Sequence, residues 1–144
     1  MSTLTIAFAR TDLEIQNCFP VMAELRPHLR AEDFVARVRR QNRDSGFELA
    51  YLADAGAIKS LGGIRISECL FNGKYLYIDD LVTSVSARSA GYGAKLFDWL
   101  VQYAREQGCD ELTLDSGVQR FDAHRFYQAR RMNINCHHFA LKLN

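Results

Sequence analysis

The stretch Tyr75–Gln107, YLYIDDLVTSVSAR followed by SAGYGAKLFDWLVQYAREQ, holds the features that decide the fold. It is typical of an apolar strand, a short loop with Arg88, Gly91 and Gly93, and an amphipathic helix that starts directly after the loop. Backbone N–H groups at such a helix start point toward one spot, where the helix dipole adds about half an elementary charge. Glycine permits close approach and positive φ, and arginine offers a planar cationic fork to phosphate oxygens. The loop therefore predicts a site for a phosphorylated ligand.

Length and charge favour a single globular domain. The chain has 144 residues, of which 48% are hydrophobic, and a formal net charge of +1. A chain of this length buries roughly 68–70% of its unfolded surface and needs no disulfide or metal staple, so we expect one domain over residues 1–144. The balanced charge gives no support for a nucleic-acid or membrane-surface partner. Without a signal-peptide pattern or an apolar run that could cross a bilayer, we expect a cytoplasmic protein.

The cysteine spacing and a cluster of arginines do not indicate a further binding site. Because the four cysteines form no C-x-x-C pair, we expect no metal, and we interpret them as mostly buried small hydrophobes: Cys18, Cys69, Cys109 and Cys136. Four arginines gather between positions 37 and 43, and we favour a solvated helix face over an anion site for them: Arg37, Arg39, Arg40 and Arg43.

Upstream of the central stretch, the patterns predict a strand, two helices and a hairpin. The first helix starts at Thr11 or Asp12 and is kinked or irregular at Pro20. Gly62-Gly63 indicates a bulge, and Asn72-Gly73 predicts a type I′ turn. The other expected elements are a strand over Leu4–Arg10, a helix over Ala31–Gln41, and strands over Phe47–Ala53, Ile58–Cys69 and Tyr75–Ser84.

Downstream, a strand over Glu111–Asp115 should lie parallel to Tyr75–Ser84 through a right-handed crossover. A helix over Phe121–Arg130 and an alternating strand over Asn133–Leu143 follow. The fold class is α/β, with a mixed, mostly antiparallel twisted sheet flanked by helices in the order β-α-α-β-β-β-α-β-α-β.

Two nucleotide-binding motifs are disfavoured for the central loop. A Walker loop requires G-x-x-x-x-G-K-[S/T], whereas Gly93 is followed here by Ala94 and Lys95. A Rossmann fingerprint requires G-x-G-x-x-G in a repeated βαβ unit, whereas Leu96 stands at the third glycine and an antiparallel hairpin precedes the loop.

The motif Arg88-x-x-Gly91-x-Gly93-Ala94, between an apolar strand and an amphipathic helix, resembles the acyl-CoA loop of the GNAT superfamily of N-acetyltransferases. The element order and the downstream segment Ala123-x-x-Phe126-Tyr127 extend this resemblance over nearly the whole chain.

The resemblance implies acetyl-CoA as the acyl donor. The family's strand would splay from its parallel neighbour and expose backbone groups to the pantetheine arm, while the loop amides cradle the pyrophosphate. The residues that it implies for cofactor binding are Leu81, Val82, Thr83, Arg88, Ser89, Ala90, Gly91, Tyr92, Gly93 and Ala94.

The resemblance also implies two catalytic side chains. Tyr127 matches the family's tyrosine, which protonates the departing thiolate; a packed helix aromatic is the alternative. Asp79 falls where some members carry a catalytic glutamate, and the alternatives are a structural carboxylate or a water chain. Adjacent strand residues face opposite ways, so Asp80 should point away from Asp79 and anchor a neighbouring segment.

Other positions are open or depart from the family. His28 is expected at a pocket edge, one of His137 and His138 could line the acceptor pocket, and His124 is expected in solvent. Arg131 and Met132 replace a common Gly-Phe pair, and Arg120 replaces a common asparagine, for which Asp115, Ser116 or Gln119 could substitute.

We therefore expect an enzyme that transfers an acetyl group from acetyl-CoA to a primary amine of a small-molecule or peptide acceptor. The alternative is a non-catalytic acyl-CoA-binding sensor or interaction module, which would keep the same loop. A homodimer is implied by the family alone, and no motif identifies the acceptor.

Overall fold

The structure is a computed structural model that describes residues 3–144. The chain forms two compact units, the first ending at Thr113 and the second beginning at Leu114. Its elements are β1 (Leu4–Phe8), α1 (Asp12–Asn17), α2 (Phe19–Leu25), α3 (Ala31–Ser45), β2 (Glu48–Asp54), β3 (Ala57–Cys69), β4 (Gly73–Thr83), the 3₁₀ helix η1 (Val85–Ala87), α4 (Tyr92–Glu106), β5 (Glu111–Leu114) and α5 (Phe121–Ala129).

Among the described residues, the strands form one five-stranded sheet in the order β1-β2-β3-β4-β5. β1 pairs with β2, β2 with β3 and β3 with β4, each time antiparallel. The predicted mixed α/β class is confirmed. β4 is the strand from which the chain enters the loop before α4, so it positions the predicted phosphate site.

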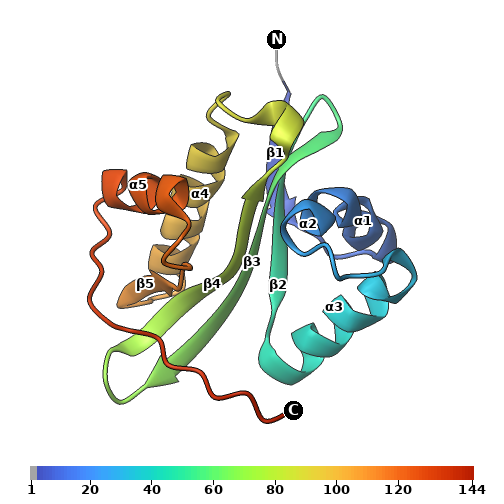
Figure 1. The fold of residues 1–144 in the computed structure, drawn as a ribbon. Coiled ribbons are helices and arrows are strands. Elements are labelled where there is room, and N and C mark those ends of the chain that lie inside the picture. Colours follow the sequence, from blue (N-terminus) through green and yellow to red (C-terminus); the bar gives the residue numbers. More distant parts are fainter. Residues whose placement is uncertain (1–2) are drawn as a thin grey trace. The chain divides into compact units, whose positions relative to one another are not determined.

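Helices cover both faces of the sheet in the first unit, with α1, α2 and α3 on one side and α4 on the other (Figure 1). On the first side, Met22, Phe34 and Val38 pack with the strand residues Leu49 and Leu61. On the other side, Gly62 lets α4 approach, because a Cβ there would lie 3.0 Å from the Leu100 side chain. The α4 residues that are buried include Leu96, Phe97, Leu100 and Ala104.

Local sequence explains why the predicted first helix is two helices. Thr11 caps α1 through a capping box, in which its hydroxyl accepts from the Glu14 N–H while the Glu14 carboxylate accepts from the Thr11 N–H. Pro20 stands in the first turn of α2, where its missing N–H costs no helical hydrogen bond. The chain therefore ends α1 at Asn17 and restarts, and the predicted irregularity at Pro20 is confirmed.

Three local predictions are wrong. Only Gly73 of the Asn72-Gly73 pair has positive φ, at 75°, so the hairpin turn is a longer loop and not a type I′ turn. Residues 133–144 carry no helix or strand, because an alternating pattern does not by itself supply a pairing partner. Of the cysteines only Cys18 is buried, while Cys69 and Cys136 are exposed.

Candidate active site

The entry to the predicted phosphate loop is held by α2. The Ser84 hydroxyl donates to the Glu24 carboxylate at 3.0 Å, and the Val85 N–H donates to the other oxygen of that carboxylate at 2.8 Å. Because one glutamate binds two successive residues after β4, the path of the chain into η1 is fixed. The loop that follows starts from a defined point.

The loop itself is exposed and runs over Arg88, Ser89, Ala90 and Gly91. Ser89 and Gly91 have positive φ, at 69° and 82°, and Gly91 is the N-cap of α4. Lys95 is the first α4 residue whose N–H reaches an intrahelical acceptor, the Gly91 carbonyl at 3.1 Å. The preceding N–H groups have no acceptor within the helix, and no described side chain caps them.

Space at Gly91 fits an incoming ligand. A Cβ there would have no described atom within 4 Å, so the side of the loop that a side chain would occupy is open. Backbone N–H groups in turn conformations at a helix start form an anion-binding concavity. The residues present therefore fit a pyrophosphate bound mainly by backbone.

Two side chains fix the start of α4. The Tyr92 hydroxyl donates to Asp54 Oδ2 at 2.7 Å, which ties the first turn to the end of β2. At Gly93 a Cβ would lie 2.9 Å from Thr83 Oγ1, so glycine permits the helix to start close to β4. The Tyr92 side chain is thus part of the scaffold, and its contribution to a ligand would come from the backbone.

A β-bulge shapes the middle of β4. Gly63 pairs with Asp80 and the next β3 residue, Ile64, pairs with Ile78, which leaves Asp79 as the extra residue. A bulge breaks the strict alternation of side chains, and both Asp79 and Asp80 line the same cavity. The prediction that these two carboxylates face opposite ways is wrong for this reason. The irregularity lies at the predicted Gly62-Gly63 position, but the extra residue belongs to β4.

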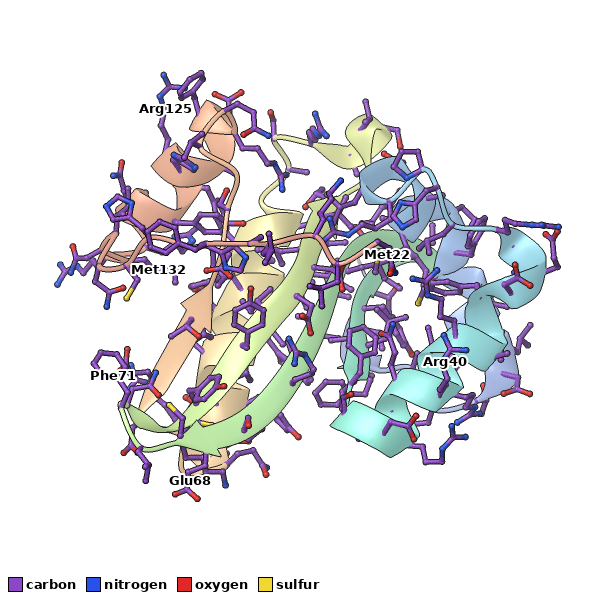
Figure 2. The ribbon with its side chains drawn as sticks, turned by 60° about the horizontal axis from the view of Figure 1, so that its bottom comes forward. Met22, Arg40, Glu68, Phe71, Arg125 and Met132 are labelled. Carbon is purple, nitrogen blue, oxygen red and sulfur yellow. The ribbon has the colours of Figure 1, made fainter. Side chains whose placement is uncertain are left out.

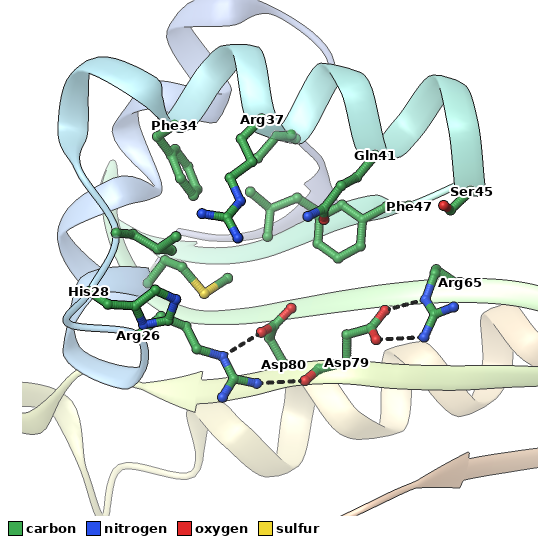
Figure 3. A pocket seen from close by; sticks show the side chains of 14 residues that line it. Arg26, His28, Phe34, Arg37, Gln41, Ser45, Phe47, Arg65, Asp79 and Asp80 are labelled. Carbon is green, nitrogen blue, oxygen red and sulfur yellow. Dashed lines mark hydrogen bonds and ion pairs between the residues drawn. The ribbon is translucent and has the colours of Figure 1, made fainter. Parts of the chain in front are cut away.

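Both carboxylates of the bulge are ion-paired (Figure 3). Asp79 accepts from Arg65 with both oxygens, at 2.7 and 2.8 Å. Asp80 Oδ1 accepts from Arg26 Nε at 2.9 Å, and the same guanidinium donates to the Asp79 carbonyl at 2.9 Å. Arg26 therefore ties the end of α2 to the bulge.

The two carboxylates differ in burial. The Asp80 side chain is 13% exposed and the Asp79 side chain 26%. Burial raises the pKa of the Asp80 carboxyl above its usual value, and the hydrogen bond from Arg26 acts in the opposite direction. Gly63 leaves the room for this carboxylate, because a Cβ there would clash with Asp80 Oδ2 and the Phe47 ring. Asp80 is therefore the more buried of the two carboxyl groups, and its burial is what raises its pKa.

The cavity beside the bulge has a volume of about 490 Å³ and lies between α3 and the sheet (Figure 3). This size is typical of small-ligand sites. Its apolar wall comes from Met22, Leu29, Phe34, Val38, Phe47 and Leu49, and its polar wall from Arg26, His28, Arg37, Gln41, Ser45, Arg65, Asp79 and Asp80.

The histidines singled out in the sequence lie in different surroundings. His28 lines the cavity, as expected for a pocket edge. Within the second unit, His124 Nε2 lies 2.8 Å from the Gly117 carbonyl, and the exposed His138 lies 3.2 Å from Asp115. Of the basic cluster on α3, Arg39 pairs with Asp12 on the surface. Arg37 is exposed, as predicted for a solvated face, but it also lines the cavity.

Tyr127 lies on α5 in the second unit. Its ring is half-buried and contacts Phe126 edge to face, with ring centroids 5.7 Å apart. Burial raises the pKa of the Tyr127 hydroxyl, and the charge of Arg120 opposes that rise. A phenol with a raised pKa stays protonated over the physiological range, as a proton donor must.

The end of α5 keeps a glycine-type geometry without glycine. Arg131 has φ 67°, its N–H donates to the Gln128 carbonyl, and the Met132 N–H donates to the Tyr127 carbonyl. These two bonds form a Schellman motif, whose left-handed residue is usually glycine. Arg131 therefore adopts a conformation that glycine usually supplies.

Sequence reasoning missed Arg26, Arg65 and Arg37. Arg26 and Arg65 were missed because their roles depend on contacts with β4, which no local pattern indicates. Arg37 was missed because it belongs to a run of charged residues that is typical of a solvated helix face. A weak indication existed at His28, which was expected at a pocket edge, since both His28 and the nearby Arg26 line the cavity.

A sequence profile of the Acetyltransferase (GNAT) family matches residues 13–132. The chain belongs to this family. This acetyltransferase is also 38% identical over 109 residues to a protein of Bacillus subtilis (strain 168) named "Uncharacterized N-acetyltransferase YhdJ", a match that covers 76% of this chain and 77% of the relative. The resemblance inferred from the Arg88–Ala94 motif is confirmed, and the protein is an N-acetyltransferase.

Solved structures of GNAT enzymes share the fold of this acetyltransferase. The aminoglycoside N-acetyltransferase AAC(6')-Iy in complex with CoA has a TM-score of 0.84 and 15% identity, covering 100% of this chain and 97% of that one. A ribosomal-protein-alanine N-acetyltransferase from Brucella melitensis biovar Abortus 2308 has a TM-score of 0.84 and 14% identity, covering 99% and 100%. Since these two proteins are named for different acceptors, the fold alone does not define the acceptor.

Two kinds of site are absent from residues 3–144. No helix in this range is long and apolar enough to cross a membrane. No group of His, Cys, Asp and Glu side chains in the same range could hold a metal ion.

Proposed function

We propose that this acetyltransferase moves the acetyl group of acetyl-CoA to a primary amine bound in the cavity between α3 and β4. The observation that carries the proposal is that one strand, β4, both lines this cavity and leads into the loop. β4 presents Asp79 and Asp80 to the cavity and then leads through η1 to the segment Arg88–Ala94, whose first four residues are exposed.

The loop supplies the donor site. The open side of Gly91, the positive φ values of Ser89 and Gly91 and the uncapped start of α4 support pyrophosphate binding by backbone N–H groups. Arg88 adds a cation on the same exposed segment. One edge of β4 pairs with β3 at Leu81, Val82 and Thr83. We still predict that the opposite edge of these three residues contacts the pantetheine arm.

Bound acetyl-CoA supplies a thioester that the amine attacks directly, so that the new C–N bond forms as the C–S bond breaks. A free alkylamine has a pKa near ~10 and is charged at neutral pH, so its nitrogen loses two protons on the way to the amide, one before it attacks and one as the C–N bond forms. The chain must remove the first proton, and the same base or solvent takes the second. The chain must also return one proton to the sulfur that leaves.

We assign the proton acceptor to Asp80, with the proton taken directly or through water. Asp79, the residue that the sequence predicts, is held with both oxygens by Arg65, whereas Asp80 keeps Oδ2 apart from its Arg26 contact. The raised pKa of Asp80 brings its basicity closer to the working pH. Asp79 stays the alternative, and matched variants separate the two.

We assign the proton donor to Tyr127. Its position one residue after Phe126 matches the family motif, and its raised pKa keeps the phenol protonated. The test of the whole proposal is release of the CoA thiol against a panel of amines, together with calorimetry of acetyl-CoA binding. We expect both binding and turnover. Binding without turnover on any amine would contradict catalysis and favour an acyl-CoA-binding module.

A further inference from the structure

The polar wall of the cavity divides into two parts with different chemistry. The sheet side holds Asp79 and Asp80, and α3 faces them with Arg37, Gln41 and Ser45 (Figure 3). These three α3 residues recur every four positions and so lie along one face of the helix. Each of their side chains can donate hydrogen bonds, so the α3 side of the cavity offers a row of donors.

The charges of the sheet side are already matched. Asp79 binds Arg65 through both oxygens, and Asp80 binds Arg26 through one. A polycationic acceptor would therefore compete with two arginines for its anchoring groups. Only Asp80 keeps an oxygen that is not engaged by a guanidinium, which suits one amine and not several.

The charged side chains that line the cavity have a net positive charge. Three guanidinium groups and two carboxylates line the cavity. The guanidinium of Arg37 extends from α3 into it (Figure 3), and no residue in the range 3–144 forms a hydrogen bond or ion pair with Arg37. An arginine fork in this position suits a planar carboxylate or a phosphate.

We propose that the acceptor is a small amine that also carries a carboxylate or phosphate group, which Arg37 binds. This inference rests on the proposed acetyl transfer, since it assigns the substrate class of the same cavity. The amine lies toward Asp80 and the acidic group toward the donor row of α3. Arg37 is thus a specificity-determining residue and not a catalytic one.

The experiment compares amines that differ in the acidic group alone. γ-Aminobutyrate and its amide test the carboxylate, phosphoethanolamine and ethanolamine test the phosphate, and spermidine tests a polycation. In γ-aminobutyrate and phosphoethanolamine several bonds separate the acidic group from the amine. Each pair therefore compares mainly the presence and absence of the acidic group. CoA release gives kcat/KM for each amine, and calorimetry on the CoA-saturated enzyme gives binding.

Arg37→Gln is the test variant and Arg40→Gln is the matched control. Arg40 is also an exposed arginine of α3 (Figure 2), but it does not line the cavity. We expect the wild type to prefer one or both acid-bearing amines by about tenfold in kcat/KM, as a charge-assisted hydrogen bond provides. Arg37→Gln should abolish the preference, and Arg40→Gln should retain it.

The outcomes separate this inference from the proposed reaction. Turnover of the neutral amines or spermidine as fast as the acid-bearing amines would overturn the inference while supporting acetyl transfer. Binding of the acid-bearing amines, lost in Arg37→Gln, without release of CoA would support the ligand class and overturn the reaction. Absence of both binding and turnover for every acid-bearing amine would also overturn the inference.

Discussion

The Arg88–Ala94 loop and the cavity between α3 and β4 are joined by one strand but are built in opposite ways. The loop presents backbone N–H groups, its residues are contiguous, and Gly91 leaves its outer side open. The cavity presents charged side chains from α2, α3, β3 and β4, and most of its charges are paired. On our proposal, backbone geometry forms the site for acetyl-CoA, the donor in every turnover, whereas side chains determine the selectivity of the acceptor site.

The largest expected effect is at the loop. Gly91→Val places a β-branched residue at φ 82° and fills the open side of the loop, so acetyl-CoA should bind at least about 100-fold more weakly. Gly108→Val is the matched control, since Gly108 also has positive φ and open surroundings, at the other end of α4. Calorimetry with acetyl-CoA measures the difference. Equal weakening in both variants would show that backbone strain alone is responsible.

Next in size is the effect at the carboxylate that we propose as the proton acceptor. Asp80→Asn should lower kcat by about 100-fold or more, whereas Asp79→Asn should have a smaller effect. Because the folded-state pKa of Asp80 is raised, its basic form is lost as pH falls through a value above the usual Asp pKa of about 3.9. The ratio of wild-type to Asp80→Asn rates should decline toward one over that range, since the amine titrates equally in both reactions. A decline seen with Asp79→Asn instead would make Asp79 the base.

The proposed proton donor, Tyr127, should give an effect of similar or smaller size. Tyr127→Phe should lower kcat by about 100-fold and leave acetyl-CoA affinity unchanged, because only the hydroxyl is removed. Tyr103→Phe is the control: burial also raises the pKa of Tyr103, but its ring packs on Phe8 at 4.9 Å in the first unit. If both variants retain the wild-type kcat, Tyr127 is a packed aromatic and not an acid.

The smallest expected effect concerns two helix ends. α4 and α5 both end in Schellman geometry, with Gly108 at φ 75° in one and Arg131 at φ 67° in the other. Arg131→Gly should stabilise the fold by about 1 kcal/mol, and Gly108→Ala should destabilise it by a similar amount. Denaturant unfolding measures both changes. A loss of stability in Arg131→Gly would show that the Arg131 side chain contributes more than its backbone strain costs.

The same contrast explains how much the sequence predicted. The loop, α4 and the position of Tyr127 were predictable because glycine spacing, helical periodicity and the family motif are local. The bulge at Asp79 was not, because it depends on how β4 pairs with β3, and it reversed the predicted facing of Asp80. The pairing of Asp80 with Arg26 spans 54 residues, and no local pattern predicts such a contact.

Two other differences between the predicted and the observed structure also arise from contacts between elements. The alternating segment Asn133–Leu143 has the strand pattern, but its apolar residues Phe139, Leu141 and Leu143 are exposed and form no strand in the structure. Arg37 belongs to a charged run on an otherwise solvated helix, and only the packing of α3 over the sheet reveals that it lines a cavity. Local patterns predict elements, and the contacts between elements decide what those elements present.

The most direct test of the two-site account is an NMR titration of the labelled protein, first with CoA and then with γ-aminobutyrate or phosphoethanolamine. The account predicts that CoA shifts the backbone N–H resonances of Arg88–Ala94 and leaves the Arg37 Nε–H resonance in place. The acid-bearing amine should then shift the Arg37 resonance. Unchanged loop resonances at saturating CoA would contradict the central claim that the Arg88–Ala94 loop binds CoA.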